Sequence, residues 1–244
     1  MRGASLATPP RPRLVVAQLP LALTLADHAS FSTFVVGDND AAVQHVRAVA
    51  GGARETLWLF GAAACGKSHL LQAACRAAAG EGGRAMYVAL GSAQPEILAG
   101  LESLDLLALD DLHAVAGRAV WEGPLFGILN EFLARRGGLL LAATAGPAAT
   151  GFELADLRSR AAGAVTYRLK ALGDRERALA LRVHAEARGL ELEPAAADYL
   201  LRRVDRDMRA LTAWLDRLDR ESLVEQRRLT VPFIRERLTG GSSD

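Results

Sequence analysis

The loop Gly61-Ala62-Ala63-Ala64-Cys65-Gly66-Lys67-Ser68 most constrains this chain, because it fits the phosphate-binding pattern G-x-x-x-x-G-K-[ST]. Such a loop joins a buried strand to a helix, and its backbone N–H groups and the positive end of the helix dipole face the phosphates. The apolar run Thr56–Phe60 predicts the strand, and a helical pattern follows the loop directly. We expect Lys67 to reach the β- and γ-phosphates of a nucleotide and the Ser68 hydroxyl to bind Mg²⁺.

Chance does not readily explain this match, although the chain is rich in Gly and Ala. Lys67 and Lys170 are the only two lysines among the 29 basic residues. Multiplying the chain's own Gly, Lys and Ser+Thr frequencies gives on the order of 10⁻³ expected matches. We therefore interpret the chain as a nucleotide-binding protein.

Strands alternate with helices on both sides of this loop, which predicts a parallel sheet with helices on both faces. Thirteen N-terminal residues with three prolines precede this pattern and predict a disordered tail. The expected strands after Thr56–Phe60 are 84–90, 104–109, 139–143 and 165–169. The expected helices of this part are 39–50, 69–80, 92–101 (with Ser92 as N-cap) and 119–135.

Asp110 and Asp111 stand where the apolar run 104–109 ends. An apolar strand that delivers acids at its carboxyl end, after a phosphate-binding loop, is typical of a Walker B element. Asp110 would hold Mg²⁺ through water, and Asp111 would orient the attacking water. The alternative is a pair of solvated loop acids, and the preceding loop favours the catalytic interpretation.

Two upstream segments leave alternatives open. The run Phe31–Gly37 either folds back near the nucleotide base or belongs to the core. The segment Gln18-Leu19-Pro20-Leu21-Ala22-Leu23 cannot be helical around its proline, and its three leucines would project alike from an extended chain. It is either a strand that covers the core or a docking peptide for a partner; the residues alone favour the strand.

Composition excludes several other classes. The net charge of +1 offers no basic excess of the kind that marks a nucleic-acid surface. The N-terminal apolar stretch 14–26 is interrupted by Gln18 and Pro20, which argues against a secretory signal, and no apolar run approaches about 20 residues. The two cysteines, Cys65 and Cys75, suggest a reduced cytoplasmic protein without structural disulfides.

From residue 172 onwards the pattern changes to nearly continuous helix, with expected starts at Asp174, Pro194, Arg206 and Val231. This predicts a small all-α lid domain. We divide the chain into a flexible N-terminal segment (1–27), an α/β nucleotide-binding domain (28–171) and the helical lid domain (172–244).

Together, the loop, Asp110-Asp111, a polar strand end at Thr144 and a helical lid resemble the AAA+ ATPases. Within that class, residues 66–71 (GKSHLL) and 34–37 (FVVG) resemble the DnaA initiator branch. An initiator would continue past the lid into a helix-turn-helix domain. This sequence stops there and has instead the segment 18–23, which is similar to a sliding-clamp-binding peptide. That combination, with residues 205–211 and 228–233, resembles the DnaA-related regulators of the Hda family over about residues 15–238.

The resemblance implies roles for further residues. Thr144 would be the sensor-1 residue, Arg160 the arginine finger and Arg209 the sensor-2 arginine; without the resemblance these would be an ordinary strand end and two solvated arginines. The implied nucleotide-binding residues are Val35, Val36, Gly61, Ala62, Ala63, Ala64, Cys65, Gly66, Lys67, Ser68, His69 and Arg209, and the implied catalytic ones are Asp111, Arg160, Thr144 and Arg209. The implied Mg²⁺ ligands are Ser68 and Asp110, and the implied partner contacts are Gln18, Leu19, Leu21 and Leu23.

Two residues depart from the family pattern. Asp111 stands where active AAA+ ATPases usually have Glu, so we expect weak turnover by the chain itself. Ala64 replaces a glycine that is common in initiator loops and is expected to reshape the loop.

The resemblance implies a regulator of DNA replication initiation. With ADP or ATP and Mg²⁺ bound, and tethered to the sliding clamp, it would stimulate ATP hydrolysis by ATP-bound DnaA and prevent re-initiation. The protein would contact DNA only indirectly, through the clamp, and would act in the cytoplasm without a membrane contact. The resemblance leaves open whether it forms a homodimer. The alternative is a helicase loader or a stand-alone AAA+ ATPase or adaptor, and a pull-down of clamp against helicase would distinguish these classes.

Overall fold

The computed structural model describes residues 28–135, 137–204, 208–225 and 229–240, and for 209, 220–225 and 238–240 it describes the backbone only. The segment 18–23, with its predicted docking or core strand, lies outside the described residues.

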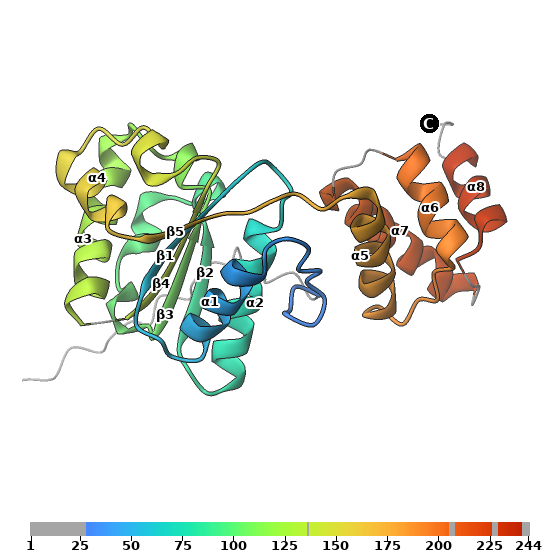
Figure 1. The fold of residues 1–244 in the computed structure, drawn as a ribbon, viewed down its shortest axis with the longest axis horizontal. Coiled ribbons are helices and arrows are strands. Elements are labelled where there is room, and N and C mark those ends of the chain that lie inside the picture. Colours follow the sequence, from blue (N-terminus) through green and yellow to red (C-terminus); the bar gives the residue numbers. More distant parts are fainter. Residues whose placement is uncertain (1–27, 136, 205–207, 226–228, 241–244) are drawn as a thin grey trace, which may run out of the picture.

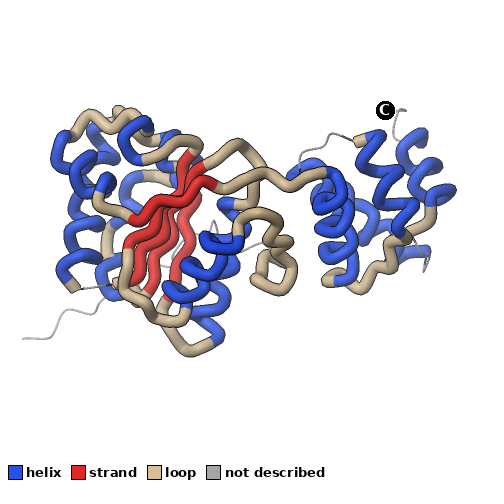
Figure 2. Tube along the Cα trace, in the orientation of Figure 1, coloured by secondary structure: helices blue, strands red, loops and turns tan. Residues whose placement is uncertain are grey.

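A five-stranded sheet forms the centre of the first domain (Figures 1 and 2). Its strands are β1 (Thr56–Phe60), β2 (Ala85–Ala89), β3 (Leu106–Asp110), β4 (Gly138–Ala143) and β5 (Val165–Arg168). They lie in the order β2-β3-β4-β1-β5, and all four pairings are parallel. The carboxyl ends of the strands therefore meet at one edge, where ligands of open α/β sheets bind. The predicted parallel sheet is confirmed.

Side chains alternate between two apolar layers because successive residues of a strand face opposite sides. Trp58, Leu107 and Leu141 pack on one face with helix α3 (Ala119–Ala134) and helix α4 (Ala155–Ala162). On the other face, neighbouring strand residues such as Leu57, Leu106 and Leu140 pack with helix α1 (Asp40–Ala50) and helix α2 (Lys67–Gly80). The central strands are buried on both faces, which explains their continuous apolar sequences.

The segment 92–101 does not form the helix that we expected. Three short 3₁₀ turns, η1 (Leu90–Ser92), η2 (Pro95–Leu98) and η3 (Leu101–Ser103), replace it. Pro95 begins the second turn, Ala99 is extended, and Gly100 has a φ of +79°. These residues break a continuous helix, because proline disfavours the helical conformation in the preceding residue and a left-handed glycine ends a helical run. Two further 3₁₀ turns, η4 (Leu112–Ala114) and η5 (Pro147–Ala149), follow β3 and β4.

The lid lies to one side of the sheet domain, beyond an extended connection from β5 (Figure 1). It consists of α5 (Asp174–Glu186), α6 (Pro194–Arg203), α7 (Met208–Glu225) and α8 (Val231–Gly240), close to the predicted helices. A separate apolar core holds it together, with Leu181, Leu200, Leu215 and Ile234 at its centre. Extended structure within the described lid is limited to one bridge, Leu192 with Leu229.

Both cysteines are free and buried, which agrees with the predicted absence of a structural disulfide. Burial raises the pKa of the Cys75 thiol to about 12, so this group is an inert core residue. None of the described helices has the length and apolar character that a bilayer-spanning segment needs.

Candidate functional site

The loop between β1 and α2 has a backbone that only glycine allows at two places. Gly66 has a φ of +99°, and a Cβ there would lie 2.7 Å from the ring of Phe34. Gly61 has a φ of +155°, and a Cβ there would lie 2.6 Å from the carbonyl oxygen of Leu169. The loop is therefore held tightly between Phe34 and the end of β5, with α2 beginning directly behind it.

Lys67 lies inside the curve of this loop and is 93% buried, with 7% of its surface exposed. Its Nζ donates hydrogen bonds to the carbonyl oxygens of Gly61 (2.9 Å) and Ala62 (2.8 Å) and lies 3.7 Å from Cys65 Sγ. A buried ammonium group at the N-terminus of a helix is a strong site for an anion. The arrangement fits the phosphates of a nucleotide.

Asp110, at the carboxyl end of β3, is 1% exposed. Its Oδ2 accepts a hydrogen bond from the Tyr87 hydroxyl (2.9 Å), and its Oδ1 accepts one from the backbone N–H of Asp111 (2.8 Å). The Tyr87 hydroxyl also interacts with the side chains of Ser68 and Gln72. Burial, followed by the Asp110 carboxylate, raises the pKa of Tyr87, so its hydroxyl stays protonated and can donate.

The predicted Mg²⁺ ligands, Ser68 and Asp110, are thus linked through Tyr87. Their oxygen-only chemistry suits Mg²⁺, which prefers carboxylate and hydroxyl oxygens over nitrogen or sulfur. Among the described residues, no cluster of three or more His, Cys, Asp or Glu side chains could hold a metal.

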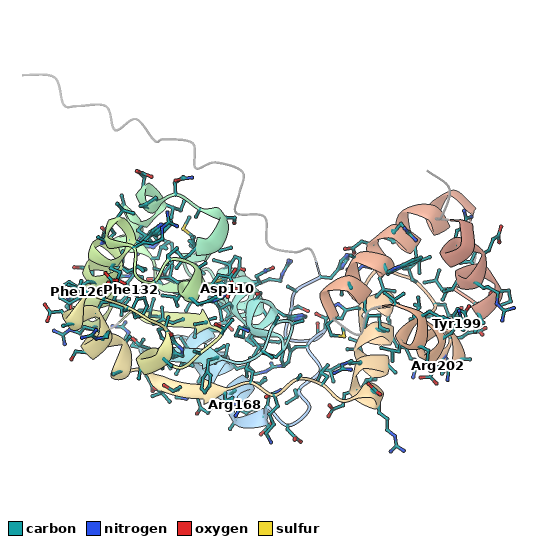
Figure 3. All side chains as sticks on the ribbon, turned by 90° about the horizontal axis from the view of Figure 1, so that it is seen from above. Asp110, Phe126, Phe132, Arg168, Tyr199 and Arg202 are labelled. Atoms are coloured by element: carbon teal, nitrogen blue, oxygen red, sulfur yellow. The ribbon has the colours of Figure 1, made fainter. Side chains whose placement is uncertain are left out.

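A cavity of about 860 Å³ extends from the loop to the lid. This volume matches the 300–1,000 Å³ that is typical of small-molecule sites. Of the predicted site residues it is lined by Val35, Ala63, Ala64, Cys65, Gly66, Lys67, Ser68, His69, Asp111 and Thr144. Figure 3 labels Asp110, which lies nearer to the lid than Phe126 and Phe132 of α3 do.

Other predicted residues lie outside the cavity wall. Gly61 and Ala62 act through carbonyl groups beneath Lys67, and Val36 packs against the core of the α1–α2 face. Asp110 lies behind the wall, beside Tyr87. Arg160 is exposed on α4, which packs on the face of the sheet opposite α2. The backbone of Arg209 lies in the first turn of α7, and its side chain is outside the described structure.

The run Phe31–Gly37, for which we left a place near the nucleotide or in the core open, lies partly at the cavity and partly in the core. Phe34 and Val35 line the cavity, whereas Phe31 and Val36 pack against the core. Phe34 also stands edge-on to the ring of His69, with centroids 5.3 Å apart.

From the lid, the sequence indicated only Arg209, and it did not reveal the lid residues that line the cavity. That wall consists of Leu172, Ala180, His184, Arg188, Met208, Thr212, Asp216 and Asp219. These residues share no motif, and only the docking of the lid beside the loop brings them there. The rings of His69 and His184 meet across this boundary, with centroids 5.4 Å apart and planes at 74°.

Comparison with known proteins identifies the type of lid and the fold of the chain. The model of the Hda lid domain matches residues 174–238, which is nearly the whole described lid. The fold resembles domain III of the Thermotoga maritima replication initiation protein DnaA, with a TM-score of 0.72, 20% identity, and coverage of 86% of this chain and 95% of that one. Residues 174–238 thus form an Hda-type lid, and the chain as a whole has the fold of DnaA domain III.

Two longer DnaA structures are also similar to this chain. One is a replication initiator DnaA bound to AMPPCP and single-stranded DNA, with 25% identity and a TM-score of 0.65. The match covers 79% of this chain and 65% of that one. For AMPPCP-bound DnaA from Aquifex aeolicus the TM-score is 0.63, the identity 25%, and the coverage 77% and 63%. The chain thus spans slightly less than two thirds of these DnaA chains.

Proposed function

We propose that this protein is a nucleotide-binding regulator of DNA replication initiation that acts on ATP-bound DnaA. The Hda-type lid beside a DnaA-like phosphate-binding loop is the observation that supports this function most strongly. The cavity between loop and lid has a volume and a buried lysine that suit a nucleotide, and Ser68, one of the two predicted Mg²⁺ ligands, lines it.

In this proposal, different groups of the loop bind different phosphate oxygens. Lys67 exchanges its two carbonyl contacts for phosphate oxygens, and the backbone N–H groups of the loop bind the remaining phosphate charge. Ser68 and Asp110 would hold Mg²⁺, and the bound ion would neutralise phosphate charge. Thr144, directly after β4, and Arg209, whose backbone lies on α7, are the further residues that we assign to the phosphate end. Both ADP and ATP fit these contacts.

Asp111 makes the chain a poor ATPase by itself. Its carboxylate is one methylene shorter than the usual glutamate and is expected to position water less well. The protein therefore acts mainly as a regulator of a second ATPase.

Arg160 is the residue that acts on that second ATPase. It is exposed on α4 and is absent from the wall of its own cavity, so its planar guanidinium is available to the nucleotide site of a neighbouring molecule. There it would stabilise the charge that develops on the transferring phosphoryl group. Arg158, on the same helix, instead donates a hydrogen bond to the carbonyl oxygen of Phe152.

The segment Gln18–Leu23 supplies the contact with the DNA polymerase sliding clamp. This assignment depends on the sequence, because the segment lies outside the described residues. Replacing Gln18, Leu21 and Leu23 by Ala should abolish clamp capture in a pull-down without changing ADP affinity. Capture of the replicative helicase instead of the clamp by the parent protein would contradict the assignment.

The decisive experiment measures ATP hydrolysis by DnaA on clamp-loaded DNA. The parent protein with ADP should accelerate it, and Arg160→Ala should lose most of this effect, since an arginine finger contributes about 10³–10⁵ in rate. Arg160→Lys should rescue poorly, because an ammonium group cannot reproduce the guanidinium fork.

Two controls complete this experiment. Arg158→Ala should retain more stimulation than Arg160→Ala, and Lys67→Ala should lose nucleotide binding in calorimetry while remaining folded. Equal stimulation by the parent and the Arg160 variant would refute the finger, and absence of stimulation by the parent would refute the regulator.

A further inference from the structure

Of the two predicted Mg²⁺ ligands, Ser68 lines the cavity and Asp110 does not. Ser68 lies at the loop end of the cavity, whereas residues of α5 and α7 line its lid end. Asp110 is 1% exposed and lies behind the wall, at the carboxyl end of β3. Both of its carboxylate oxygens are engaged, Oδ2 by the Tyr87 hydroxyl and Oδ1 by the backbone N–H of Asp111. The charge of Asp110 therefore acts on the cavity through other groups.

Tyr87 of β2 stands between Asp110 and Ser68. Its hydroxyl lies 2.9 Å from Asp110 Oδ2 and also hydrogen-bonds to the side chains of Ser68 and Gln72. Those two residues are one turn apart on the same face of α2. One phenol oxygen thus ties the first turns of α2 to the end of β3. The ring packs in the apolar layer under α2, and Tyr87 is not among the described residues that line the cavity.

The direction of these hydrogen bonds follows from the protons available. A carboxylate only accepts, so Tyr87 donates its single hydroxyl proton to Asp110. The phenol oxygen is then the acceptor for the Ser68 hydroxyl and the Gln72 amide. The proton of Ser68 is therefore directed to Tyr87, and the lone pairs of Ser68 Oγ remain for a ligand in the cavity.

This arrangement suits a cation ligand. Mg²⁺ binds a lone pair of a hydroxyl oxygen and repels the hydroxyl proton, so that proton needs an acceptor on the other side of the oxygen. A chain of hydrogen bonds that ends on a carboxylate polarises each member in the same direction. The alternative is a structural role, in which Tyr87 only satisfies the buried carboxylate of Asp110. That role does not require the contact between Tyr87 and Ser68.

We propose that Tyr87 is a positioning residue of the Mg²⁺ site, which transmits the effect of the Asp110 charge to the Ser68 hydroxyl and fixes the direction of that hydroxyl. This inference rests on the proposed nucleotide binding. It refines the role of Asp110, which acts on the ion through Tyr87 and Ser68. Tyr87 itself touches neither the ion nor the nucleotide.

Calorimetry of ADP binding, in one series with MgCl₂ and in another with EDTA, tests this role. The ratio of the two dissociation constants gives the gain in ADP affinity that Mg²⁺ provides. Tyr87→Phe should remove most of this gain, up to about 10-fold, since groups that orient a metal ligand account for about 10- to 100-fold in metal affinity. ADP affinity in EDTA should stay at the parent value, because the contacts of Lys67 and the loop are intact.

Tyr167→Phe is the matched control. Tyr167 of β5 packs against the same face of the sheet, and its hydroxyl lies 3.0 Å from His45 Nδ1. This variant should keep the parent's Mg²⁺ gain. Gln72→Met removes a donor to Tyr87 at nearly constant length and should lower the gain less than Tyr87→Phe does. If Tyr87→Phe does not fold, a Gln72→Met variant with the full parent gain would overturn the proposal.

A double-mutant cycle separates this route from a direct effect of Asp110 on the ion. Asp110→Asn keeps the shape of the side chain and an acceptor for Tyr87 but removes the charge. It should lower the Mg²⁺ gain of the parent and have little further effect in the Tyr87→Phe background. Equal losses in both backgrounds would overturn the proposal, because Asp110 would then act without Tyr87.

The outcomes also separate this inference from the function on which it rests. A parent that binds no ADP in either series would refute both. A parent that binds ADP equally with MgCl₂ and with EDTA would refute the Mg²⁺ site and the role of Tyr87, while nucleotide binding stands. A clear gain in the parent, with the same gain in a Tyr87→Phe variant of lowered Tm, would show that Tyr87 is a structural residue and would refute its role alone.

Discussion

Two non-glycine residues of the described chain, Ala64 and Asp111, adopt a left-handed backbone, with φ of 56° and 58°. Both line the cavity. Strained backbone of this kind gathers at functional sites. Asp tolerates the left-handed region because its short polar side chain can bond locally, and this gives a structural reason for a short acid at position 111. Ala64 has no such compensation.

Glycine at position 64 should therefore stabilise the protein. The left-handed conformation costs an L-residue about 1–2 kcal/mol, and the larger entropy of unfolded glycine offsets about 0.5–1 kcal/mol of that. We expect Ala64→Gly to raise the free energy of unfolding by about 0.5–1 kcal/mol in urea titrations. Ala63→Gly, at a neighbour without positive φ, should lower it. A loss of stability in both variants would show that Ala64 is unstrained.

The lowered pKa of His184 predicts acid sensitivity. Its pKa is 6.5 in the unfolded chain and about 4 in the folded one, so between these values the unfolded state binds more protons. Stability from this residue is complete above pH 6.5 and is lost as pH falls towards 4, by roughly 3 kcal/mol at most.

Urea titrations of the parent and His184→Leu from pH 7.5 to 4 measure this effect. The variant should lose less stability over that range, although His69, whose pKa burial also lowers, contributes to both curves. Parallel curves would contradict the prediction.

At the scale of elements, one buried carboxylate fixes the start of α4. Glu122 of α3 is 3% exposed and accepts hydrogen bonds from the backbone N–H groups of Gly117, Glu153 and Leu154. Burial would raise its pKa, but these bonds and the charge of Arg158 hold it below the ordinary value. The negative charge lies at the N-terminus of α4, where it stabilises the helix that bears Arg160.

Glu122→Gln should therefore destabilise the protein by about 1–3 kcal/mol, because an amide NH₂ would face N–H donors in place of a carboxylate oxygen. Faster hydrogen exchange at residues 153–162 should accompany this loss, and stimulation of DnaA should fall more than ADP affinity. Glu131→Gln, on an exposed position of the same helix, is the control. If exchange in α4 stays unchanged, Glu122 does not position that helix.

Prediction from sequence succeeded where a local pattern decides the structure. The buried strands and the lid helices have apolar spacing that tertiary contacts reinforce. It failed over 92–101, where Pro95 and Gly100 outweighed the helical pattern. It also missed α4, an eight-residue helix with few buried side chains that depends on Glu122, 32 residues before Leu154.

At the scale of the whole molecule, the site is shared between segments far apart in the chain. The loop end was predictable because its motif encodes both a backbone shape and a chemistry. The lid end was not, since His184 reaches the cavity only through the docking of α5 beside His69. Asn39 supports that arrangement: its side chain exchanges two hydrogen bonds with the backbone of Lys170, just before the lid begins.

We therefore expect a bound nucleotide to contact both domains and to stabilise them together. Because walls of the cavity belong to both, ADP at 100 times its Kd should stabilise the folded chain by about 2.7 kcal/mol and raise its Tm by about 5–10 °C. Hydrogen exchange should slow in α5 as well as in the loop, since His184 of α5 lines the cavity and its ring meets that of His69. Lys67→Ala should show neither effect at the same ADP concentration. Protection confined to the loop, with α5 exchanging as in the free protein, would mean that the lid takes no part in binding and that the two domains respond to nucleotide independently.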